Sequence, residues 1–351
     1  MGERKGEIIN WLRQAAEHDY SIEKIKEALA ETGYNEGEIN SILKIREKLK
    51  KKKRLKLKSH EENERLKLED MPAEIREVYD LISKTKEEVK KVIVGQEDTI
   101  NAFMCALLCD GHVLLEGVPG IAKTLLVKAL AEASGCSSKR IQFTVDLLPS
   151  DIIGITTYTP EKGFETIKGP IFANFIIADE INRSPPKTQS ALIEAMQEKQ
   201  VTIAKETYPL PLPFFVMANN NPLESSGVYD LPEAQVDRFL FKVIMGYPTP
   251  KEEGKIMEEN VTLRKFESFD IRPILSAEKI IEMQRITKNI YMNQKVRDYI
   301  INIVQKTRKR DFKHGEYIEW GGSPRASIGI FIASKAWALM SGRNYVVPQD
   351  V

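Results

Sequence analysis

The sequence has little of several features that would narrow its class. Three cysteines in 351 residues (Cys105, Cys109 and Cys136) are too few for the disulfide framework of a small secreted domain. Cys105 and Cys109 lie four residues apart in an apolar stretch, so we expect buried free thiols on one helix face, which fits a reducing compartment. No apolar run approaches the roughly 20 residues of a membrane span, and the N-terminus lacks the apolar stretch of a signal peptide. We therefore expect a cytoplasmic protein without a membrane span.

An excess of one charge is also absent, because 52 basic residues face 51 acidic ones, for a formal charge of +1. A globally basic nucleic-acid binder is therefore not indicated. Residues 44–58 are a local exception, with ten Lys or Arg and one Glu. This run is either a solvated helix face or a contact with nucleic acid, acidic protein or anionic lipid. No aromatic residue lies between Tyr34 and Tyr79, so nucleic-acid binding there would depend on phosphates and on salt.

The length and the ordinary globular composition, 42% hydrophobic and 29% charged, predict two or three domains. Residues 1–48 show three short helical patterns, the first two separated by an acidic turn and the last two by Gly33. They resemble a ubiquitin-associated (UBA-like) three-helix bundle. Residues 49–71 continue the basic run as a helical linker. We expect an α/β core over residues 72–248 and a helical domain over 249–351.

The expected core contains short apolar runs that are typical of buried strands. Helical stretches separate most of these runs, which predicts a parallel five-stranded sheet. The runs are His112–Glu116, Ile141–Thr144, Asn174–Ala178, Phe214–Ala218 and Phe239–Val243.

The first of these strands leads into a glycine-containing loop, a Lys-Thr pair and a helix, which is the context of a nucleotide phosphate loop. Backbone N–H groups before the helix can hold phosphate oxygens, and the helix N-terminus adds positive potential. Lys123 would neutralise the β and γ phosphates, and the Thr124 hydroxyl would ligate Mg²⁺. The strict pattern has glycine where this chain has Ala122, and alanine can serve there if its φ is negative.

A later apolar strand ends in two acids, Asp179 and Glu180. Beside a phosphate loop, the first acid can hold Mg²⁺ and the second can act as general base toward the attacking water. A strand followed by Asp-Glu is common, so the prediction depends on the conjunction of the two motifs.

These residues resemble the AAA+ ATPases, and within them the MoxR family, over about residues 84–351. The resemblance implies an AAA+ core with a C-terminal helical lid, and ATP with Mg²⁺ as cofactors. Its hallmarks occur in the family's order and are listed here as they stand in this chain: Val94–Glu97, Glu116–Thr124, Asp146–Ile152, Gly169–Phe172, Asp179–Arg183, Leu231–Phe239 and Gly322–Ala326.

The resemblance also implies roles for single residues. Asp179 and Thr124 would hold the metal, and Glu180 would be catalytic. Three residues would lie near the adenine: Val94, Gly95 and Gln96. The phosphates would lie against Gly117, Val118, Pro119, Gly120, Ile121, Ala122, Lys123, Thr124 and Leu125.

Three more residues carry catalytic roles by this resemblance. Asn221, before Pro222, matches sensor 1, with Asn219 as the fallback because Asn219, Asn220 and Asn221 are consecutive. The family's usual Thr-Gln before that Asn is missing here. Arg238 matches an arginine finger that acts on the neighbouring subunit, which implies a ring, hexameric by resemblance. Arg325 matches sensor 2 on the lid, reaching the γ-phosphate of its own subunit.

The function implied by the resemblance is ATP hydrolysis that drives chaperone-like remodelling or maturation of protein complexes, with a von Willebrand factor A-domain partner. Residues 160–170 resemble the helix-2 insert of this clade, which lines the pore or faces partners. The lid is expected to be incomplete at Val351, because MoxR lids usually continue with another helix. Two alternatives stay open: a nucleic-acid motor related to the MCM helicases, and a nucleotide-gated scaffold that does not hydrolyse ATP.

Overall fold

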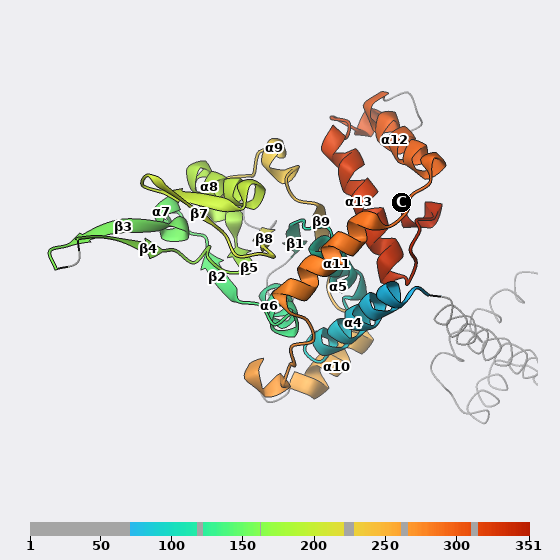
Figure 1. Ribbon diagram of the computed structural model, residues 1–351, viewed down its shortest axis with the longest axis horizontal. Helices are drawn as coiled ribbons and strands as arrows, with labels where there is room; N and C mark the ends of the chain where they lie inside the picture. The colour runs from blue at the N-terminus through green and yellow to red at the C-terminus, as the bar shows by residue number, and fades with distance from the viewer. Residues whose placement is uncertain (1–70, 118–121, 162, 221–227, 261–265, 310–314) are drawn as a thin grey trace, which may run out of the picture. The chain divides into compact units, whose positions relative to one another are not determined.

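The computed structural model describes residues 71–117, 122–161, 163–220, 228–260, 266–309 and 315–351. The chain divides into two compact units, Met1–Met71 and Pro72–Val351, and the described helices and strands belong to the second (Figure 1). The predicted N-terminal helical domain and the basic run 44–58 lie outside the described residues.

A parallel five-stranded sheet forms the centre of the second unit, in the order β2-β5-β8-β1-β9. Apolar side chains of its middle strands are buried on both faces, as parallel sheets covered by helices require. The predicted sheet is confirmed, although β2 begins three residues before its apolar signal because its first residues are polar and lie at the sheet edge. The strands are β1 (Val113–Gly117), β2 (Ser138–Gln142), β5 (Phe175–Asp179), β8 (Phe215–Asn220) and β9 (Phe241–Met245).

The register brings the carboxyl ends of these strands to one edge of the sheet. Gln142 of β2 pairs with Asp179 of β5, and Gly117 of β1 pairs with Met245 of β9. Asn219 follows Ala218 of β8, which pairs with the residue before Asp179. Polar side chains from separate strands therefore meet at this edge, where ligands bind in open α/β sheets.

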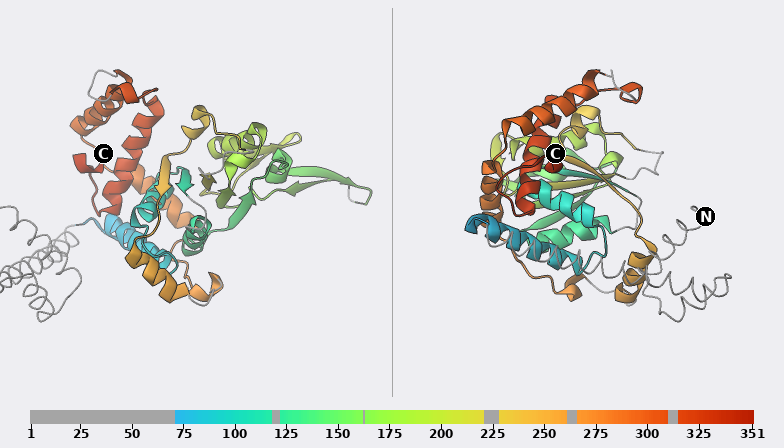
Figure 2. Two further views of the ribbon diagram at one scale, coloured as in Figure 1. Left: turned by 180° about the vertical axis from the view of Figure 1, so that it is seen from behind. Right: turned by 90° about the vertical axis from the view of Figure 1, so that its right-hand side faces the viewer.

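Helices cover the sheet and form the lid (Figures 1 and 2). Around the sheet lie α4 (Ala73–Lys90), α5 (Glu97–Leu108), α6 (Lys123–Ala133), α7 (Pro149–Ile153), α8 (Pro186–Glu198) and α9 (Glu233–Val236). The C-terminal helices are α10 (Pro250–Asn260), α11 (Ala277–Asn289), α12 (Gln294–Lys309) and α13 (Pro324–Met340). Helix α11 packs against α5, and α13 packs against α4 and α5. None of the described helices is long and apolar enough to cross a membrane.

Two antiparallel hairpins extend the core. One joins β3 (Gly154–Thr159) to β4 (Gly163–Lys168), and the other joins β6 (Gln200–Ile203) to β7 (Glu206–Pro209). The first overlaps the predicted insert at 160–170 but begins at Gly154 and ends at Lys168. Both Figure 1 and Figure 2 (left) show it projecting away from α12 and α13. The second hairpin was not predicted, because its short strands carry only two buried apolar residues.

Candidate nucleotide-binding site

The positive end of the site lies at the start of α6. This helix begins at Lys123, so its first backbone N–H groups face the end of β1, where a helix N-terminus favours an anion. Lys123 Nζ donates a hydrogen bond of 2.6 Å to the Gly117 carbonyl oxygen. Burial lowers the pKa of Lys123, and the nearby Asp179 and Glu180 oppose that shift. The predicted loop residues Val118, Pro119, Gly120 and Ile121 lie outside the described residues.

Ala122, just before the helix, adopts the left-handed conformation, with φ of 62° and ψ of 27°. The condition stated above for alanine to replace glycine without strain, a negative φ, is therefore not met. Glycine usually occupies this position because a Cβ makes the left-handed region unfavourable. Alanine is the smallest side chain that carries this cost.

The metal-binding residues lie between α6 and β5. The Thr124 hydroxyl donates to both carboxylate oxygens of Asp179, each at 3.3 Å. Asp179 ends β5 and is 4% exposed. A hydroxyl and a carboxylate are hard oxygen ligands of the kind that Mg²⁺ prefers, so the residues present fit the predicted metal.

Glu180 follows at a strained position that a neighbouring strand supports. The backbone φ of Glu180 is 56°, and residues other than glycine adopt such a value mainly where the surrounding structure holds them. The Glu180 backbone N–H donates to Asn219 Oδ1 at 2.8 Å, and Asn219 Nδ2 donates to Asp179. A single amide of β8 therefore orients both acids.

Of Asn219 and Asn220, the two asparagines of this run that the structure describes, Asn219 hydrogen-bonds to both acids. Asn221, the residue predicted as sensor 1, lies outside the described residues.

Sequence reasoning missed three residues that contact the acids. Arg140 of β2 forms an ion pair with Asp179, and Gln142 Nε2 donates to Glu180 Oε2 at 2.8 Å. Arg183 Nε lies 3.2 Å from the same Glu180 oxygen. Arg183 is within a motif quoted above, but Arg140 and Gln142 reach the site only through the pairing of β2 with β5.

The residues predicted near the adenine precede α5. Gln96 directly precedes this helix, and its Nε2 donates to the Gly246 carbonyl oxygen at 3.1 Å. Gly95 has a φ of +71°, and a Cβ there would lie 2.2 Å from Glu252 Oε1. The partly buried segment Val94–Gln96 therefore runs beside the residues that follow β9.

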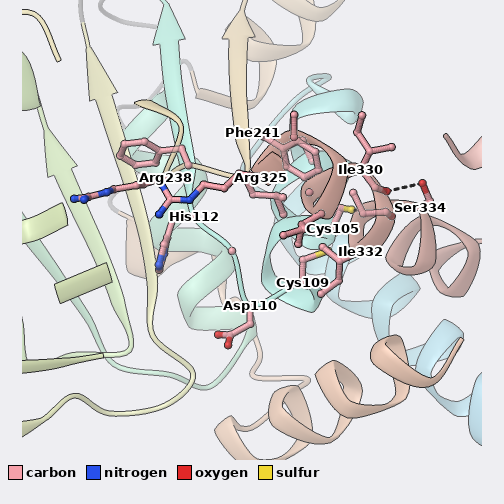
Figure 3. Close-up of a pocket in the computed structure, with 18 of the residues that line it drawn as sticks. Cys105, Cys109, Asp110, His112, Arg238, Phe241, Arg325, Ile330, Ile332 and Ser334 are labelled. Carbon is pink, nitrogen blue, oxygen red and sulfur yellow. Dashed lines mark hydrogen bonds between the residues drawn. The ribbon is translucent and has the colours of Figure 1, made fainter. Parts of the chain in front are cut away.

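Arg238 and Arg325 lie elsewhere. Both line a cavity of about 890 Å³ with His112, Leu240 and residues of α5 and α13, and Figure 3 shows the two arginines in the same part of it. His112 directly precedes β1, whereas Lys123 comes after the other end of this strand. A strand of five residues is about 16 Å long.

The position of Arg325 follows from its helix. Ser323 caps α13 by accepting from the Arg325 backbone N–H at 3.1 Å, and its hydroxyl also donates to Asp237. This places Arg325 next to Arg238 at the amino ends of β1 and β9. The expected contact of Arg325 with the phosphates of its own subunit does not agree with this arrangement.

The fold, the Lys-Thr pair at the start of α6 and the acid pair after β5 define a P-loop nucleotide-binding ATPase. Comparisons with known proteins agree. Residues 112–241 match the model of the "ATPase family associated with various cellular activities (AAA)", and residues 311–351 match the model of an AAA lid domain.

Individual relatives are more specific. Chaperone MoxR1 of Mycobacterium tuberculosis is 48% identical over 272 residues, which are 75% of this chain and 70% of that protein. The uncharacterized protein YeaC of Bacillus subtilis is 45% identical over 276 residues, 78% of this chain and 84% of YeaC. A crystal structure from Cytophaga hutchinsonii, provisionally described as an ATPase, is 42% identical with a TM-score of 0.73, covering 84% of this chain and 87% of that one. The chain belongs to the MoxR family of AAA+ ATPases.

Proposed function

We propose that this chain hydrolyses ATP in a Mg²⁺-dependent reaction and uses the energy to remodel protein complexes. The observation that carries the proposal is the convergence of Thr124, Asp179 and Glu180 at one edge of the sheet, with Lys123 at the adjoining helix N-terminus. These groups supply what phosphoryl transfer requires: neutralisation of charge, a metal site and an oriented carboxylate.

Each residue has a distinct task in this proposal. Lys123 exchanges the Gly117 carbonyl oxygen for phosphate oxygens, and Thr124 with Asp179 holds the metal. When bound, Mg²⁺ supplies charge neutralisation on the transferred phosphoryl group. Glu180 accepts the proton of the attacking water, while Asn219 keeps the Glu180 backbone in its strained position.

The two arginines complete the site from another subunit. Arg238 and Arg325 share a cavity at the opposite end of β1, so in a closed ring they would face the nucleotide of the neighbouring copy. Arginine suits this task because its guanidinium donates in a fixed, planar geometry to phosphate oxygens. We infer a homo-oligomeric ring, hexameric by its resemblance to the family.

The β3–β4 hairpin offers a contact surface for a protein client. Tyr158 and Phe164 are 63% and 81% exposed, and their rings pack 5.1 Å apart on this hairpin. Exposed apolar patches of this kind commonly mark protein-interaction sites. A client that is a protein complex fits the chaperone name of the mycobacterial relative, and a von Willebrand factor A-domain partner stays part of the proposal.

A pair of substitutions tests the reaction. Glu180→Gln removes the base but keeps the shape, so we expect turnover to fall at least about 100-fold while ATP binding persists. Lys123→Ala should lose nucleotide binding itself. Phosphate release and the binding of a fluorescent ATP analogue measure the two quantities. Parent protein with no turnover above that of Glu180→Gln would support the nucleotide-gated scaffold instead.

A further inference from the structure

Asp179 is a buried carboxylate whose oxygens already have partners. Thr124 and Asn219 donate to it as neutral groups. Arg140 is the cation that forms an ion pair with it among the described residues. Because a buried carboxylate without a countercharge is unfavourable, Arg140 supplies the charge that this site needs before any metal binds.

Arg140 is linked to both acids, directly to Asp179 and through Gln142 to Glu180. Its Nε donates to Asp179 Oδ2, and its Nη2 donates to Gln142 Oε1 at 3.0 Å. Gln142 in turn donates to Glu180. The side chains of Asp179, Arg140, Gln142 and Glu180 therefore form one continuous chain of hydrogen bonds along the carboxyl edge of β2 and β5.

The same geometry makes Arg140 a competitor of the metal. Asp179 cannot keep a full ion pair with the Arg140 guanidinium and also ligate a divalent cation without bringing two positive groups together. The Arg140 side chain is 59% exposed whereas that of Asp179 is 5% exposed, so Arg140 is the partner that is free to turn into solvent. Thr124 and Asn219 carry no charge and do not compete in this way.

We infer that Arg140 is a resident counter-cation of the metal-binding carboxylate, and that its release sets the Mg²⁺ concentration at which nucleotide is bound. This inference rests on the proposed nucleotide site. It assigns Arg140 a positioning role: the residue stabilises the nucleotide-free chain and is exchanged for the metal when the site is loaded.

The test is a Mg²⁺ titration of the full chain with a fluorescent, non-hydrolysable ATP analogue. Arg140→Ala should lower the Mg²⁺ concentration for half-maximal binding by about three- to tenfold, as expected for losing one partly exposed ion pair. Arg140→Lys keeps the positive charge but loses the planar donors that reach Asp179 and Gln142, so its Mg²⁺ requirement should lie between those of the parent and Arg140→Ala. Lys139→Ala removes an exposed cation of the same strand that lies outside the Arg140–Asp179 ion pair, and its Mg²⁺ requirement should stay within about twofold of the parent.

A second readout separates this role from simple packing. Arg140→Ala should lower the melting temperature of the nucleotide-free chain, and Mg²⁺ with the analogue should restore it to the parental value. An equal loss of stability with and without ligand would overturn the inference, as would an unchanged or higher Mg²⁺ requirement in Arg140→Ala. If the parent chain shows no Mg²⁺-dependent nucleotide binding, the proposed function itself is overturned. This result differs from a failure of the Arg140 inference, because it is seen in the parent chain without any variant.

Discussion

Ala122 is the residue at which the phosphate loop departs from the common pattern, and its left-handed backbone has a measurable cost. We predict that Ala122→Gly raises the free energy of unfolding by about 1 kcal/mol, because the Cβ that disfavours this conformation is removed. Urea unfolding of the nucleotide-free chain measures the change. Ala129→Gly, the same substitution inside α6, should instead lower stability by at least about 1 kcal/mol. Destabilisation by both substitutions would show that Ala122 is not strained.

The residues of the site differ in how directly the sequence reveals that they belong to it. Lys123, Thr124, Asp179 and Glu180 were predicted from short local patterns: the first two begin the helix that follows the loop after β1, and the two acids lie at the end of β5. Arg140 reaches Asp179 through strand register, which a single sequence does not display. The neighbours of Arg325 depend on how α13 packs against α5, and no local pattern encodes that packing.

At the scale of elements, His112 connects β1 to two other elements. Its Nδ1 accepts from the Val216 N–H of β8 at 3.1 Å, so its Nε2 carries the proton and donates to the Met196 carbonyl oxygen of α8. This arrangement requires the neutral imidazole. Burial lowers the pKa of His112 to about 4.

A pH dependence of stability follows from this shift. Below its unfolded pKa of about 6.5 the unfolded chain binds a proton that the folded chain refuses. The stabilisation by neutral His112 is therefore complete above that pH and is lost as the pH falls toward 4, by about 3 kcal/mol in all. Urea unfolding at several pH values should show this loss in the parent and not in His112→Gln, whose amide offers both hydrogen bonds without titrating. Parallel pH profiles for the two proteins would contradict the prediction.

The β3–β4 hairpin carries a prediction about clients. Phe164 is 81% exposed, so Phe164→Ser should change stability by less than about 0.5 kcal/mol and leave nucleotide binding intact. We expect it to weaken protection of a heat-denatured reporter enzyme, followed by light scattering in the presence of ATP. Tyr299→Ala removes an exposed aromatic residue of α12 and is the matched control. Equal protection by both variants would remove the hairpin from the proposed client surface.

Elements were predictable where burial leaves a pattern. The central strands are continuous apolar runs, and the helices α11 and α12 have apolar residues at helical spacing, so both signals are strong. The strands of the two hairpins alternate exposed polar and apolar residues in runs of four to six, which is a weak signal in a single sequence. Exposed side chains make the β3–β4 hairpin suitable for binding a partner. Because these strands lack a buried apolar run, the sequence did not indicate where the hairpin begins and ends.

At the scale of the whole molecule, the positions of Arg238 and Arg325 imply that nucleotide binding and ATP hydrolysis have different requirements. Lys123, Thr124 and Asp179 belong to one site within one chain, so a single chain should bind nucleotide. Arg238 and Arg325 lie at the other end of β1, so turnover should require an assembled interface. In a ring with head-to-tail interfaces, each interface joins different surfaces of two copies. The nucleotide-binding residues and the arginines of one active site then come from different copies, so mixing two variants can test them separately.

Hybrid assemblies provide the test. Arg238→Ala and Glu180→Gln are each expected to be inactive alone, but a mixture places an intact Glu180 of one variant against an intact Arg238 of the other. At equal amounts about a quarter of the interfaces carry both groups, so turnover should recover to about that fraction of the parental value if interfaces act independently. A mixture of Arg325→Ala with Glu180→Gln should recover the same fraction of turnover, because Arg325 lines the same cavity as Arg238. Phosphate release after subunit exchange measures the recovery of turnover. The control is a mixture of Lys123→Ala with Glu180→Gln. It cannot recover, because Lys123 and Glu180 must both be intact in the same subunit, the one that binds the nucleotide. A silent mixture with Arg325→Ala, beside an active one with Arg238→Ala, would place Arg325 on the nucleotide of its own subunit.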